Sequence, residues 1–282
     1  MAPRGVATAL SAVAGDADRR ATRHVAAALA GMLLLYAAAL VALGPLPQDP
    51  AYHLFADLRT CLGVIPRAGD VLTNLAILAA GVYGLAIRSR MNVTPEERPA
   101  ADLLIAGAFL TAAGSAYYHW DPHNATLVWD RLPMMLTIPP VLALVLADRV
   151  RPAFARRALV PLTVFAVASV LWWSLSEALG MEDVRLYLMV RVLLVVAILL
   201  LVVLRRPRYT GGGWLLAALA GEVAMMTFER LDHQVFAWTG GLASGHNLKH
   251  VMVGVALACV FAWLRLRTGP VGAPDRGRAA AA

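Results

Sequence analysis

Residues 185–204 read RLYLMVRVLLVVAILLLVVL, and this stretch decides the fold class. Arg185 and Arg191 are its only charged residues. A helix of this length rises about 1.5 Å per residue and so spans about 30 Å, the thickness of the hydrocarbon core of a bilayer. The stretch therefore predicts a transmembrane helix.

Seven further apolar stretches have the length that a membrane-spanning helix needs, about 17 to 23 residues. They cover residues 25–43, 70–87, 101–119, 127–147, 158–178, 213–229 and 246–264. The first could be a signal peptide, but its charged leader of about two dozen residues favours a retained anchor. We therefore expect an all-α protein, a polytopic transmembrane helix bundle with a seven-helix core and one extra N-terminal transmembrane helix.

The composition agrees with a membrane protein. Of 282 residues, 60% are hydrophobic and only 15% are charged, more apolar side chain than a soluble domain could bury. The net charge of +7 could indicate a nucleic-acid partner, but the arginines lie in short clusters between the apolar stretches, so no nucleic acid is expected. Cys61 is expected in a loop and Cys259 deep in a helix, so no disulfide is expected.

The arginines also indicate the orientation, because arginine-rich loops stay on the cytoplasmic side of a membrane. If the N-terminus is inside, the outer loops contain only Arg59, Arg67, Arg185 and Arg230. We therefore expect a multi-pass protein of the cell membrane with both termini in the cytoplasm. Residues 24–265 should form the bundle, with its core at 70–265, and 1–20 and 268–282 should be disordered tails.

Polar side chains near the ends of three stretches form the candidate site, because an ionisable group inside a bilayer needs a partner or a function. Ser115 and His119 stand four residues apart at the end of the third stretch, and so share a helical face. His246 and His250 have the same spacing at the start of the eighth stretch, and Asp130 lies at the start of the fourth. The orientation places all three ends at the outer face, where these side chains can meet.

Three histidines with water in a fourth position make the open tetrahedral shell of a catalytic zinc, and we expect His119, His246 and His250 to form it. A b-type haem fits less well, because its two axial histidines approach from opposite sides. His123 also follows His119 by four residues, but Pro122 should end the helix before it. A metal or proton transporter would need polar groups at several depths, whereas these lie at one face.

Five other polar residues have simpler expected roles. Arg191 and Glu222 lie at matching depths from the outer face and should form an ion pair. Asp232 and His233 could support the metal ligands from the last outer loop, but a solvated position in that loop is favoured for both. Lys249 should point away from the histidines and extend to the interface.

The pattern Ser115-x-x-x-His119, Asp130 eleven residues later and His246-x-x-x-His250 resembles the alkaline ceramidase family. It is also similar to the wider superfamily of seven-helix membrane hydrolases, which includes the adiponectin and progestin receptors. The resemblance implies a zinc-dependent amidohydrolase that cleaves a ceramide-like N-acyl sphingoid lipid into a fatty acid and a sphingoid base. It places zinc on the three histidines, the Asp130 carboxylate beside the water and the Ser115 hydroxyl facing the reacting carbonyl.

The resemblance covers about residues 70–265, and Asp70-Val71-Leu72-Thr73-Asn74 is similar to an Asn-Thr-x-Ser-Asn stretch of the family. The animal enzymes carry a Trp- and acid-rich calcium-binding segment before that helix, and the neighbours of Asp57-Leu58-Arg59-Thr60 show no clear equivalent. Zn²⁺ is therefore the expected cofactor, and Ca²⁺ is left open. The expected partners are the lipid substrate and the bilayer, with no known protein partner. The alternative is a receptor-like or transport protein that uses the same metal site without turnover.

The residue types also suit amide hydrolysis on their own. Zinc lowers the pKa of a water molecule that it binds from about 15.7 towards 7. Asp130 would accept the proton of this water and pass it to the departing nitrogen. The Ser115 hydroxyl would stabilise the oxyanion. Ser115 is less attractive as a covalent nucleophile, because no histidine is left to act as its base.

Overall fold

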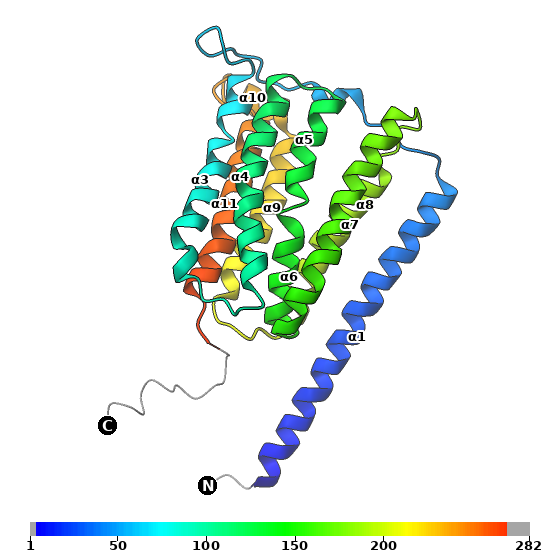
Figure 1. The fold of residues 1–282 in the computed structure, drawn as a ribbon, viewed down its shortest axis with the longest axis vertical. Coiled ribbons are helices and arrows are strands. Elements are labelled where there is room, and N and C mark those ends of the chain that lie inside the picture. The colour runs from blue at the N-terminus through cyan, green and yellow to red at the C-terminus, as the bar shows by residue number, and fades with distance from the viewer. Residues whose placement is uncertain (1–3, 270–282) are drawn as a thin grey trace.

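The computed structural model describes residues 4–269, and the regular elements in that part of the chain are helices (Figure 1). In chain order they are α1 (Arg4–Ala42), η1 (Pro50–His53), α2 (Ala68–Leu72), α3 (Leu75–Ile87), η2 (Arg88–Arg90), α4 (Arg98–Trp120), α5 (Asn124–Met134), α6 (Ile138–Arg149), α7 (Pro152–Ala178), α8 (Arg185–Leu204), α9 (Gly212–Arg230), α10 (Asp232–Trp238) and α11 (Gly245–Leu266).

Six segments are long and apolar enough to cross a membrane. They are Ala68–Arg90, Arg98–Trp120, Asn124–Arg149, Pro152–Ala178, Arg185–Leu204 and Gly245–Leu266, and each overlaps an expected stretch. The two other expected stretches correspond to the shorter apolar part of α1, Ala26–Ala42, and to α9, which carries Glu222 and Glu229. The predicted all-helical fold is therefore confirmed for the described residues, and six of the eight expected spans have the length and composition to cross a membrane.

The expected stretch 127–147 is divided into α5 and α6. Pro139 and Pro140 explain the break, since a proline has no backbone N–H to donate to the carbonyl four residues earlier. The carbonyls of Met135 and Leu136 therefore lack the partners that a continuous helix would provide. The break leaves α5 as a short helix at one end of the bundle.

α1 is longer than expected. It runs without interruption from Arg4 to Ala42, so helix replaces the disorder expected for most of the tail 1–20. The many alanines in this segment explain the difference, because alanine has the highest helix propensity. Residues 1–3, and 270–282 of the other expected tail, lie outside the described residues. α1 packs against α8 at the edge of the bundle (Figure 1).

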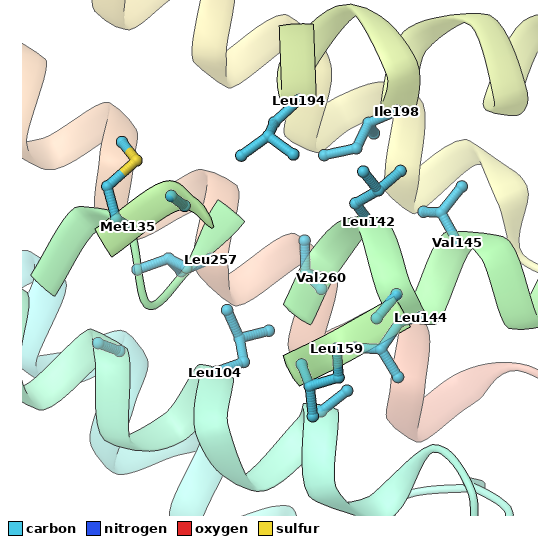
Figure 2. Close-up of a cluster of buried hydrophobic side chains, with 14 of the residues drawn as sticks. Leu104, Met135, Leu142, Leu144, Val145, Leu159, Leu194, Ile198, Leu257 and Val260 are labelled. Carbon is cyan, nitrogen blue, oxygen red and sulfur yellow. The ribbon is translucent and has the colours of Figure 1, made fainter. Parts of the chain in front are cut away.

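The core lies where α4, α6, α7, α8 and α11 meet (Figure 2). It contains Leu104, Leu142, Leu159, Leu194 and Leu257, one from each of these helices. α11 packs against α3 on one side and α9 on the other. The end of α4 and the starts of α5 and α11 lie at the same end of the bundle, next to the segment that joins α1 to α2 (Figure 1). This arrangement positions the site.

Candidate metal centre

Three buried histidines meet at this end of the bundle. His119 comes from the last turn of α4, and His246 and His250 come from the first two turns of α11. The centroid of the His119 ring lies 4.7 Å from that of His246 and 4.8 Å from that of His250, and the last two are 4.8 Å apart. One nitrogen of each ring lies within 4.8 Å of the other two. The predicted convergence of the three imidazoles is confirmed.

The nitrogen atoms of this triad fit a metal ion. His119 Nε2 lies 3.2 Å from His246 Nε2, so two rings turn their nitrogens toward one another. His250 Nε2 is buried and has no hydrogen-bond partner. A buried polar atom without a partner is costly, and a bound cation would satisfy it. The triad can therefore hold a metal ion, with three protein nitrogens and a position open to another ligand.

His250 is held in one tautomer by α2 and the break that follows it. The Thr73 hydroxyl lies 3.0 Å from His250 Nδ1 and donates to the backbone carbonyl of Gly69 at 2.7 Å. Because its hydrogen is used there, the Thr73 oxygen must accept from Nδ1–H. The backbone carbonyl of Asp70 also accepts from this ring. His250 Nε2 is thus left with the lone pair that a metal requires.

The start of α11 is fixed by polar contacts on all sides. Ser244 caps the helix by accepting from the backbone N–H of Asn247. The backbone N–H of His246 donates to Asp232 Oδ1 at 2.7 Å, and the other Asp232 oxygen accepts from the N–H of Ala56 at 2.9 Å. Asp232 is only 7% exposed, so the expected solvated position was wrong. The carboxylate is buried because it holds the helix start and the outer loop together.

Asp130 and Ser115 form a second polar pair beside the triad. Both are buried, and the Ser115 hydroxyl donates a hydrogen bond to the Asp130 carboxylate. Ser115 lies one helical turn before His119, so the bond places Asp130 on the histidine-bearing face of α4. The structure therefore brings the three histidines together, with Ser115 one helical turn from His119 and Asp130 beside Ser115. His123 lies apart from them as the N-cap of α5.

Lys249 differs from its expected position. It is 8% exposed, and its ammonium lies 2.6 Å from Glu229 Oε1 of α9 and 3.5 Å from His246 Nε2. The prediction that the Lys249 side chain extends to the interface was therefore wrong. A residue three positions after another on a helix lies beside it, so the spacing from His246 already contained this signal.

The loop between α1 and α2 covers the triad. The ring of Phe55 lies 4.8 Å from that of His119 and 4.6 Å from that of His246. Tyr52, from the same loop, donates to Glu229 Oε1 at 3.1 Å, and burial, followed by the charge of Glu229, raises the pKa of Tyr52 to about 12. Its hydroxyl therefore keeps its proton at neutral pH. No sequence motif indicated that these loop residues belong to the site.

A cavity of about 120 Å³ lies directly below the site. Four of its lining residues lie one helical turn from residues at the site: Thr111 from Ser115, Met134 from Asp130, Met225 from Glu229 and Val253 from Lys249. The other lining is mostly apolar, apart from Arg191 and Glu222, whose nearest charged atoms are 3.5 Å apart. The predicted ion pair is therefore confirmed. α9 packs closely on α11 and only weakly on α8, and residues of both α8 and α9 line the cavity.

Comparison of the chain with protein-family models, curated proteins and solved structures finds no match. The geometry of the triad, the Ser115–Asp130 pair and the cavity therefore carries the functional argument.

Proposed function

We propose that this protein is a zinc-dependent intramembrane hydrolase that cleaves the amide bond of a ceramide-like N-acyl lipid. The observation that carries the proposal is the buried histidine triad with a carboxylate and a hydroxyl beside it, directly above an apolar cavity. The triad alone could serve many metal proteins. A carboxylate that can move a proton, together with a space that accepts an alkyl chain, favours hydrolysis of a lipid.

His119, His246 and His250 would hold a divalent ion, which when bound would supply an activated water and polarise a carbonyl. Asp130 takes the proton of the attacking water while the water oxygen bonds to the amide carbon. Asp130 then gives this proton to the nitrogen as the carbon–nitrogen bond breaks, leaving a fatty acid and an amine. Ser115 orients the Asp130 carboxylate through its hydrogen bond. Phe55 and the outer loop exclude bulk water from the triad.

The proposal also includes the membrane topology. We propose that α1 and α9 cross the bilayer with the six longer apolar segments, so that both termini lie in the cytoplasm and the triad lies toward the outer face. The distribution of arginines in the loops supports this orientation. The cavity would then lie within the hydrocarbon region, where it can take an acyl chain from the bilayer.

Zinc analysis of the purified protein, combined with release of labelled fatty acid from ceramide, tests the proposal. The wild type should contain about one zinc per chain, and His250→Ala should lose both zinc and hydrolysis. Asp130→Ala should keep zinc and lose about 10²- to 10⁴-fold in rate. His233→Ala is the matched control, because this histidine is exposed on α10 and contacts only a loop carbonyl.

Two results would contradict the proposal. Wild-type protein without bound zinc would remove its metal basis. Zinc at full occupancy without any release of fatty acid would favour a receptor-like protein that uses the same site without turnover.

A further inference from the structure

A buried cation beside a metal-binding triad requires an explanation. The Lys249 ammonium lies 3.5 Å from His246 Nε2, the nitrogen that faces His119 across the triad. A metal ion held by these nitrogens would repel the ammonium, and burial makes such repulsion stronger. A lysine placed only for packing would turn its charge to the membrane surface. Lys249 is held inward, which indicates that its charge interacts with a group bound at the triad.

Two residues outside α11 hold the ammonium in this position. Glu229 Oε1 accepts from Lys249 Nζ at 2.6 Å and from the Tyr52 hydroxyl at 3.1 Å. The carboxylate balances the charge of the lysine and fixes its direction. An ammonium has three N–H bonds. With one directed at Glu229, the others are available on the side of the triad.

The hydrogen bond of Ser115 also favours Lys249 as the donor to the reacting carbonyl oxygen. A serine has a single hydroxyl hydrogen, and here Ser115 donates it to Asp130. While this hydrogen is directed at Asp130, the hydroxyl does not donate to the carbonyl oxygen of a bound amide, the role expected for it from the sequence. An amide carbonyl that gains negative charge during attack still needs a donor. Lys249 is the cationic donor nearest to the triad nitrogens among the described residues.

We infer that Lys249 is a further catalytic residue, whose ammonium donates a hydrogen bond to the reacting carbonyl oxygen of the lipid and then binds the carboxylate of the released fatty acid. The inference rests on the proposed hydrolase function. Lys249 keeps its proton throughout and stabilises charge only. Asp130 transfers the proton, from the attacking water to the departing nitrogen.

Kinetics of Lys249→Met and Lys249→Arg with labelled ceramide test the catalytic role. Lys249→Met should keep its zinc and lose about 10²- to 10³-fold in kcat, with a smaller change in KM. Lys249→Arg should recover part of the loss, because it keeps the positive charge. Arg88→Met is the matched control, since it removes a cation from the exposed pair with Asp102 at the other end of α3. Unchanged kcat in Lys249→Met would overturn the inference.

A double variant separates catalysis from stability. Lys249→Met alone leaves the Glu229 carboxylate buried without its cation, which could unfold the protein. Lys249→Met combined with Glu229→Met removes both charges, so it should recover any thermal stability lost in Lys249→Met and keep zinc while hydrolysis stays low. Recovery of hydrolysis in the double variant would overturn the inference, because the pair would then be structural only.

Binding of radiolabelled oleate supplies a readout that does not depend on turnover. Oleate should bind the zinc-loaded wild type more tightly than oleyl alcohol does, and Lys249→Met should weaken oleate binding about tenfold or more without affecting the alcohol. Equal oleate affinity in wild type and Lys249→Met would overturn the inference. If the wild type cleaves no ceramide but its oleate affinity depends on Lys249, the proposed hydrolase fails while the anion-binding role of Lys249 stands.

Discussion

A single hydroxyl group determines which nitrogen of His250 can bind a metal. Thr73 accepts from Nδ1 because its own hydrogen is donated to the Gly69 carbonyl. The metal-binding nitrogen is therefore prepared before any ion arrives. Such support of a ligand by a neighbouring group typically changes metal affinity by about 10- to 100-fold.

Thr73→Val should lower zinc affinity by about 10- to 100-fold while the protein stays folded. The valine has the same shape but cannot accept from Nδ1. Competition with a chelator of known affinity measures the change. Thr227→Val is a close control, because the Thr227 hydroxyl also donates to the carbonyl four residues earlier but touches no histidine. Equal affinities in the two variants would show that Thr73 does not support the ligand.

The ion pair in the cavity wall gives a second prediction at this scale. Arg191→Ala leaves Glu222 without its partner in a largely apolar space and should destabilise the protein by on the order of 2–3 kcal/mol. Adding Glu222→Ala should restore part of this stability, because the unpaired charge is gone. Thermal unfolding in detergent of the two single variants and the double variant measures the coupling. A double variant no more stable than Arg191→Ala would contradict a direct pairing.

At the scale of elements, the sequence predicted the long apolar helices well, because their positions follow from composition alone. The stretch 185–204 coincides with α8. The four-residue spacing placed Ser115 and His119 on one face of α4, and it placed His246 and His250 on one face of α11. The break between α5 and α6 was not predicted, although Pro139 and Pro140 mark it in the sequence. Asp232 was also misplaced, since no local pattern records that a distant helix start needs its carboxylate.

Gly114 allows α4 and α5 to approach closely. A methyl group on this glycine would collide with the backbone carbonyl of Trp129, the residue before Asp130. Gly114→Ala should therefore move α5 away from α4, cost about 1–3 kcal/mol and separate the Asp130 carboxylate from Ser115. Hydrolysis should fall more than zinc content does.

Gly213→Ala is the matched control for this substitution. Gly213 is also helical, on α9, and a methyl group there would meet no atom within 4 Å. Thermal unfolding and the ceramide assay compare the two variants. Similar stability and rate in both would show that the α4–α5 contact does not position the site.

At the scale of the whole molecule, the prediction concerns orientation. In a background with both native cysteines replaced by serine, a membrane-impermeant maleimide should label Leu242→Cys on intact cells. Arg206→Cys should react only after lysis, because the proposed topology places the loop between α8 and α9 at the cytoplasmic end. Both positions are exposed in the structure, so access to the reagent depends on the membrane alone. The reverse labelling pattern would invert the topology and place the triad inside.

The ring of Phe55 shields the triad from the water above, while the cavity below is bordered by weakly joined helices. If the protein is the proposed hydrolase, its substrate should dissolve in the bilayer before it is bound. Its occupancy of the site then follows its mole fraction among neighbouring lipids and not its amount per litre. Adding inert phospholipid to vesicles should slow turnover, whereas adding buffer should leave it unchanged.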